Sequence, residues 1–183
     1  MIVCAGNIES FEFATPIGIG LIESSINLTK LILKKKPQNL LFIGSAGSYG
    51  KAKIFDIFHT NQAINMEISY LEDKSYSPLD NKIVADIDNV SCETNNMLVN
   101  SSNYITSNKH SANLFLKKGI DAENMEFFAF LKVANHFKIP ALGILIITNY
   151  CYENAHEEFV KNHEKSKELL SLHVKEIKNR WIK

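Results

Sequence analysis

The longest apolar run of the chain, residues 141–147, places the strongest limit on its fold. Leucine and isoleucine dominate the run, and it lacks the polar alternation of a strand with one face in water. Strands of this kind are typical of parallel or mixed sheets that helices cover on both faces. The run is also far shorter than the ~20 apolar residues that a membrane-spanning helix needs. It therefore predicts a buried strand, over residues 141–148, inside an α/β protein.

Apolar runs and amphipathic segments alternate along the rest of the 183 residues, as in other α/β proteins. We expect strands at residues 1–5, 11–15, 40–43, 58–66, 83–87 and 97–99, and helices at 21–35, 111–118, 127–137 and 155–178. The strand at 40–43 is expected to stop at a Gly-Ser-Ala-Gly turn, and residues 72–93 to be mostly loop. No linker or repeat divides the chain. We therefore predict one domain over residues 1–183, a three-layer α/β/α fold with a central mixed sheet.

The charge of the chain limits its partners. A formal net charge of +0 gives no electrostatic reason to expect nucleic acid or an anionic membrane. Arg180 is the only arginine, so a site that holds phosphate through a bidentate arginine is not expected. The cysteines Cys4, Cys92 and Cys151 form no CxxC pair and indicate neither a disulfide framework nor structural zinc. Without a basic, apolar leader, the chain is expected to be a soluble cytoplasmic protein.

The last expected helix carries His156, Glu157 and His163, which differ in spacing from the zinc-binding HExxH pattern. Histidines seven residues apart on a polar helix are expected at the surface. We therefore predict neither a metal nor a cofactor.

Polar or glycine-rich residues follow several of the expected strands, where ligands bind in α/β sheets. Glu9 follows the first strand, Ser45 lies in the turn after residues 40–43, and Asn149 follows the last strand. Met125 and Glu126 come just before the aromatic helix. Each has an ordinary structural explanation, such as a tight turn, a solvated loop or a favourable helix dipole. Singly, none of them defines a function.

In their order along the chain, these segments resemble the nucleoside phosphorylase/nucleosidase superfamily, which includes methylthioadenosine/S-adenosylhomocysteine nucleosidase, futalosine hydrolase and the hexameric purine nucleoside phosphorylases. Residues 40–47, Leu-Leu-Phe-Ile-Gly-Ser-Ala-Gly, look like the family's apolar strand and glycine-serine turn. Residues 122–129, Ala-Glu-Asn-Met-Glu-Phe-Phe-Ala, resemble its Met-Glu ribose motif, and Ile-Pro at 139–140 continues the match. The resemblance covers most of the chain. It implies an enzyme of purine salvage that cleaves the bond between a purine-type base and ribose, as a dimer or hexamer.

The resemblance also implies how a nucleoside is bound. Glu126 is similar to the carboxylate that accepts hydrogen bonds from the two ribose hydroxyls, which suits its two oxygens. Met125 matches the thioether that packs on the sugar, and Tyr104 matches the aromatic ring that stacks on the base. The implied substrate-binding set is Ser45, Ala46, Gly47, Tyr104, Met125 and Glu126.

Two further residues are implied in catalysis. Glu9 matches the carboxylate that takes a proton from attacking water, while Ser45 lines the place of the water or phosphate nucleophile. Asn149 stands where the nucleosidases and hexameric phosphorylases have an aspartic acid that protonates the departing purine. An amide can donate a hydrogen bond there but no proton, and general-acid help is typically worth ~10²–10⁴-fold in rate.

Other departures concern the nucleophile. Phe42 and Ile43 stand where the family's phosphorylases hold phosphate with an arginine, and only Lys51 and Lys53 follow nearby. Leu145 replaces an arginine that the nucleosidases carry on the strand before the acid. The missing arginines favour water over phosphate. Hydrolysis is the leading hypothesis, and phosphorolysis or nucleoside binding with little or no catalysis stays open.

Overall fold

The computed structural model describes residues 1–87, 94–95 and 97–181, which leaves Cys92 outside the described residues. The helices are α1 Gly20–Lys35, α2 Ile68–Leu71, α3 Lys109–Lys117, α4 Phe127–His136 and α5 Ala155–Trp181. The strands are β1 Ile2–Cys4, β2 Thr15–Pro16, β3 Leu40–Ser48, β4 Ile57–Thr60, β5 Gln62–Ile64, β6 Lys82–Val84, β7 Val99–Asn100, β8 Ala122–Glu123 and β9 Ala141–Tyr150.

β3 and β9 form the centre of the fold, because they pair in parallel along the whole length of both strands. β1 and β8 share the other edge of β3, and β7, β5 and β6 continue the sheet beyond β8. β4 runs antiparallel to β9, and β2 flanks β1. Within the described residues the nine strands therefore form one sheet that is mixed, as predicted.

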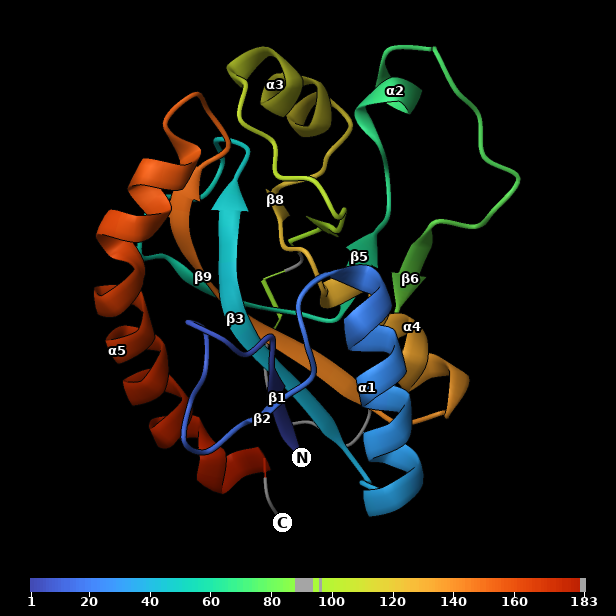
Figure 1. The fold of residues 1–183 in the computed structure, drawn as a ribbon, viewed down its shortest axis with the longest axis vertical. Coiled ribbons are helices and arrows are strands. Elements are labelled where there is room, and N and C mark those ends of the chain that lie inside the picture. Colours follow the sequence, from blue (N-terminus) through green and yellow to red (C-terminus); the bar gives the residue numbers. More distant parts are fainter. Residues whose placement is uncertain (88–93, 96, 182–183) are drawn as a thin grey trace.

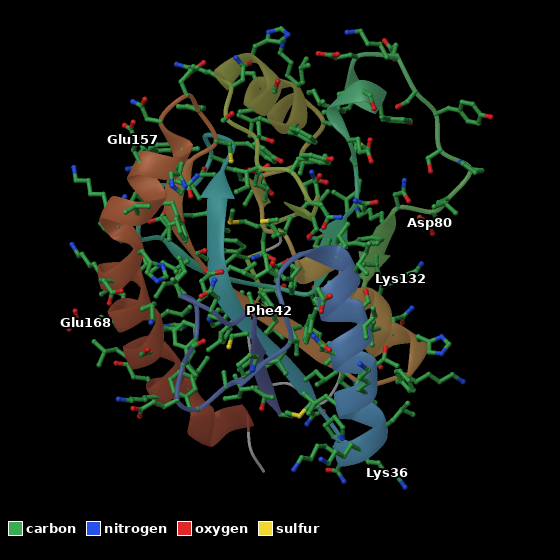
Figure 2. All side chains as sticks on the ribbon, in the orientation of Figure 1. Lys36, Phe42, Asp80, Lys132, Glu157 and Glu168 are labelled. Carbon is green, nitrogen blue, oxygen red and sulfur yellow. The ribbon has the colours of Figure 1, made fainter. Side chains whose placement is uncertain are left out.

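Helices cover both faces of the sheet, α5 on one side and α1 with α4 on the other (Figure 1). Successive residues of β3 point to opposite faces. Phe42 packs in the cluster beneath α1 and α4, whereas Leu41 and Ile43 pack with Leu170 of α5. Figure 2 shows Phe42 in the interior and Glu168 on the outward side of α5. The burial of β3 and β9 on both faces explains their apolar sequences, and the three-layer α/β/α prediction is confirmed.

β3 is longer than predicted, and the expected Gly-Ser-Ala-Gly turn after residue 43 is wrong. Residues 44–48 pair with residues 145–150 of β9, so this segment is the second half of the strand. Small residues are needed here because the surroundings are tightly packed: a Cβ on Gly44 would lie 3.0 Å from the ring of Phe42. The glycines indicate close packing against the strand, and not the end of it.

The expected strands at 11–15 and 58–66 are also shorter in the structure. Only Thr15 and Pro16 pair with β1, because residues 11–14 form a turn in which Ala14 N–H donates to the Phe11 carbonyl. The run at 58–66 divides at Asn61 into β4, which pairs with β9, and β5, which pairs with β6 and β7. The two-residue β8 and the short α2 had no counterpart among the expected elements.

Gly143 of β9 gives a direct test of this packing. A Cβ at Gly143 would overlap the buried ring of Phe127, the first residue of α4. We expect Gly143→Ala to lower the free energy of unfolding by about 1–3 kcal/mol, as overpacking of a core does. Urea denaturation measures the loss, and Phe127→Leu in the same chain should restore part of it because the two sites touch. A loss in the double variant equal to the sum of the two single losses would contradict the contact.

Candidate active site

The candidate site lies where one edge of β3 is left unpaired. β9 occupies the opposite edge throughout, whereas β1 ends opposite Phe42 and β8 begins opposite Gly47. Between these points the backbone of Ser45 bonds to side chains: its N–H donates to Glu9 Oε1 at 2.9 Å, and its carbonyl accepts from Asn124 Nδ2 at 2.9 Å. This gap in the strand pairing therefore holds two polar side chains against the backbone of β3.

A cavity of about 270 Å³ opens above this gap, near the carboxyl ends of β3 and β9. Such strand ends are where α/β sheets bind ligands. The cavity brings together every residue that the sequence placed at the site. Those lining residues are Glu9, Ser45, Ala46, Gly47, Tyr104, Met125, Glu126 and Asn149. Their individual roles stay predictions.

Glu126 is held at the start of α4 by contacts from two directions. Its Oε1 accepts a hydrogen bond from the N–H of Gly20, the first residue of α1, at 2.8 Å. The Oδ1 of Asn124 accepts from the backbone N–H groups of Glu126 and Phe127, at 2.9 and 2.8 Å. Asn124 also bonds to β3 through its amide, so it fixes the start of α4 against the sheet. The sequence offered Asn124 as a polar group before α4 without giving it a role, although an asparagine just before a helix is a common capping signal.

The pKa of Glu126 is raised to about 7, mainly because the side chain is buried and only 2% exposed. The negative charge of Glu9 raises it further, while the hydrogen bond from Gly20 lowers it. Two carboxylates thus interact electrostatically across one cavity. Near neutral pH, Glu126 exchanges between a form that accepts hydrogen bonds on both oxygens and a protonated form.

This raised pKa makes the stability of the protein depend on pH. Below about pH 4.5 the Glu126 carboxyl is protonated in both the folded and the unfolded state. Between about pH 4.5 and pH 7 only the folded state keeps the proton, so the free energy of unfolding falls as the pH rises through this range. Relative to wild type, Glu126→Gln should therefore gain about 3 kcal/mol of unfolding free energy between pH 4 and pH 8. Urea denaturation of both proteins across this range measures the difference. A difference in unfolding free energy that does not change with pH would show that folding does not raise the pKa of Glu126.

Glu9 reaches the edge of β3 because the chain turns tightly after β1. Gly6 has a φ of +101°, and the N–H of Glu9 donates back to the Gly6 carbonyl at 3.0 Å. Glycine is required there, because a Cβ would lie 2.9 Å from Pro16 of β2. The turn is also held by α5, where His163 Nε2 lies 3.0 Å from the carbonyl of Ile8. His163 is buried by this contact, so its expected place at the surface is wrong.

Asn149 lines the cavity with its amide already hydrogen-bonded to the protein. Its Oδ1 accepts from the hydroxyl of Thr148 at 2.8 Å, and its Nδ2 donates to the carbonyl of Tyr150 at 3.1 Å. One amide hydrogen is left for the cavity. Asn149 is thus placed to donate a hydrogen bond to a ligand, but it holds no acidic proton.

Three residues that line the cavity were not predicted from the sequence, and one predicted residue is largely exposed. His156 and Phe159, from the first turns of α5, line it, as does Glu123 of β8. These residues reach the cavity through long-range packing, and no local pattern assigned them to the site. Tyr104 is 85% exposed and lies at the rim.

Neither lysine nor arginine is among the residues that line the cavity in the described chain. Lys51, which the sequence offered as a replacement for a phosphate-binding arginine, forms an ion pair with Asp121 at 2.8 Å. The described residues contain no group of three or more His, Cys, Asp or Glu that could hold a metal ion. No helix in the same part of the chain is long and apolar enough to cross a membrane.

The α/β/α fold thus brings the carboxyl groups of Glu9, Glu123 and Glu126 around one cavity near the ends of its central strands. The chain belongs to the phosphorylase superfamily, whose family model matches residues 2–179. The resemblance seen in the sequence is thereby confirmed, and membership agrees with the expectation of a nucleosidase or phosphorylase. No curated protein sequence matches the chain.

Solved structures share this fold at low sequence identity. An aspartate-to-asparagine mutant of Helicobacter pylori methylthioadenosine/S-adenosylhomocysteine nucleosidase, with 5′-methylthioadenosine in its active site, gives a TM-score of 0.78 at 20% identity, covering 91% of this chain and 79% of its own. Futalosine hydrolase of Helicobacter pylori gives 0.78 at 20% identity, with 91% and 78% covered. S-adenosylhomocysteine nucleosidase of Streptococcus pyogenes, in complex with 5-methylthiotubericidin, gives 0.71 at 14% identity, with 85% and 73% covered. These similarities show a common fold.

Proposed function

We propose that this protein hydrolyses the N-glycosidic bond of a nucleoside, with a purine-type base as the leaving group. The observation that carries the proposal is the pair of carboxylates, Glu9 and Glu126, facing one cavity at the unpaired edge of β3. The solved relatives that bind 5′-methylthioadenosine and 5-methylthiotubericidin support a nucleoside as the substrate class.

The two carboxylates have different tasks in this proposal. Glu126, fixed by Gly20 N–H on one oxygen, has hydrogen-bond capacity left for the ribose hydroxyls, and Met125 packs against the sugar. Glu9 is oriented by the N–H of Ser45 and takes a proton from water as the water attacks the anomeric carbon. The attack meets an oxocarbenium-like carbon, as in other glycoside hydrolyses. Tyr104 at the rim covers the base once a ligand is present.

Water is favoured over phosphate as the nucleophile by the charges around the cavity. Phosphate needs cationic or multiple N–H donors, and lysine and arginine are both missing from the described lining residues. Lys51 is engaged with Asp121. Glu9 would in addition repel an incoming phosphate anion.

The fixed amide of Asn149 favours a second candidate, a nucleoside-binding protein with little or no catalysis. Its hydrogen bonds to Thr148 and Tyr150 hold it in place as a donor that cannot protonate a leaving base. Such a protein would keep the ribose contacts of Glu126 and release no base.

A substrate panel separates these functions. The purified protein is incubated with methylthioadenosine, adenosine, inosine and futalosine, with and without phosphate, and free base is measured. Release without phosphate supports hydrolysis, and release only with phosphate supports phosphorolysis. Binding without release, kept in Glu9→Gln and lost in Glu126→Gln, supports the binding protein.

We also propose that the protein assembles into a dimer or hexamer and that it acts in purine salvage. Analytical ultracentrifugation tests the assembly.

A further inference from the structure

A second buried carboxyl group, Glu123, lines the cavity together with Asn149. The register of the sheet places it there: Gly47 of β3 pairs with Glu123 of β8 on one side and with Asn149 of β9 on the other. Paired residues in neighbouring strands point to the same face of a sheet. Glu123 and Asn149 therefore flank Gly47 on the cavity side.

The missing side chain of Gly47 lets these groups converge. A Cβ at Gly47 would lie 3.1 Å from Asn149 Nδ2, 3.4 Å from Glu123 Cγ and 2.7 Å from Cys151 Sγ. The space that a larger residue would fill is thus bounded by a carboxyl group and an amide. Glu9, by contrast, bonds to Ser45, two residues earlier on β3, which separates the two carboxylates along the strand by roughly 7 Å of backbone.

The surroundings of Glu123 suit an acid that holds a proton and then gives it up. Its Oε2 accepts from the hydroxyl of Tyr49 at 2.7 Å, its Oε1 accepts from the N–H of Thr106 at 2.9 Å, and the thiol of Cys151 also bonds to it. Burial raises the pKa of Glu123, which is 9% exposed, and the hydrogen bonds from Thr106, Tyr49 and Cys151 lower it in part. The net direction is upward, so the carboxyl keeps its proton to a higher pH than usual. Burial also raises the pKa of Tyr49 well above its ordinary value, so Tyr49 stays a donor to the carboxylate that forms.

We propose that Glu123 is a further catalytic residue, the general acid that gives the departing base the proton that Asn149 cannot supply. This inference rests on the proposed hydrolysis. The bond between the anomeric carbon and the base nitrogen breaks, its electron pair goes to the base, and the proton of the Glu123 carboxyl moves to the base. The water oxygen bonds to the anomeric carbon and its proton passes to Glu9. Proton exchange with solvent then returns both carboxyl groups to their starting states.

The test compares two leaving groups on the same sugar. A purine leaves with help from a proton, whereas nitrophenolate is a good leaving group that needs none. Whichever of adenosine and inosine, the panel members with unmodified ribose, is cleaved faster is therefore compared with 4-nitrophenyl β-D-ribofuranoside. In Glu123→Gln, kcat/KM should fall by ~10²–10⁴-fold for the nucleoside and by at most about fivefold for the nitrophenyl riboside. Glu168→Gln, on the exposed side of α5 (Figure 2), is the matched control and should change neither rate.

A second measurement needs no variant, which matters if Glu123→Gln folds poorly. In wild type, the rate of nucleoside cleavage should fall as the pH rises and Glu123 loses its proton, and the nitrophenyl riboside should show no such fall. Equal losses for both substrates in Glu123→Gln, or alkaline limbs that coincide, would overturn the role of Glu123 while leaving hydrolysis intact. Cleavage of the nitrophenyl riboside alone, or of neither substrate, would overturn the proposed hydrolysis of a nucleoside itself.

Discussion

Replacing Glu9 with glutamine is expected to lower the rate of base release by ~10²–10⁴-fold, the usual contribution of a general base. The amide oxygen of glutamine can still accept the N–H of Ser45, which Glu9 Oε1 now accepts at 2.9 Å, so the loop should keep its position. What glutamine cannot do is take a proton from water. Nucleoside affinity should therefore stay within a few-fold of wild type while turnover is lost.

Turnover is measured by base release, and affinity by calorimetric titration of the same nucleoside. Glu12→Gln supplies the control, because Glu12 lies exposed on the same loop. Unchanged turnover in Glu9→Gln would assign the activation of water to another group. Parallel loss of affinity and turnover would mean that Glu9 serves mainly to hold the loop.

Replacing Glu126 with glutamine is expected to weaken nucleoside binding by ~10²–10⁴-fold, because hydrogen bonds to a charged acceptor are worth about 1.5–3 kcal/mol each and two ribose hydroxyls are involved. The bond from Gly20 N–H, at 2.8 Å, can persist to the amide oxygen of glutamine, so the entry into α4 is preserved. The affinity of wild type should also rise between pH 6 and pH 8, since the pKa of Glu126 is about 7 and the ionised form accepts from both hydroxyls.

Calorimetry with a ribonucleoside and its 2′-deoxy analogue isolates this contact. Wild type should bind the deoxy analogue more weakly, and Glu126→Gln should distinguish the two poorly. Glu157→Gln, on the exposed side of α5 (Figure 2), serves as the control. Equal discrimination by wild type and Glu126→Gln would exclude Glu126 from the ribose contact.

Periodicity in the sequence predicted the long elements well, because local burial patterns define them. The run that became β9, the aromatic α4 and the charged α5 were all placed within a few residues. The end of β3 was predicted wrongly because glycine and serine are frequent in turns. Pairing with β9 along residues 44–48 keeps that segment extended despite its composition.

In the candidate site, too, residues within a local sequence pattern were predicted, and residues that depend on long-range pairing were not. Glu9, Glu126 and Asn149 were named from their order in a recognisable pattern, and they line one cavity. Glu123 was not assigned to the site and Asn124 was given no role in it, because their importance depends on the partners they meet on β3. A two-residue strand such as β8 has no periodicity of its own. Its register with Gly47 exists only once the sheet has formed.

The most direct test of the account is the chemical identity of the sugar product. The panel nucleoside that is cleaved fastest, labelled with ¹³C at the anomeric carbon, is incubated with the wild-type protein in phosphate buffer and followed by ¹³C NMR. If the protein is a hydrolase, the signal moves to free sugar, with one equivalent of base released. Accumulation of the sugar 1-phosphate, or a bound nucleoside whose signal stays unchanged, would contradict it.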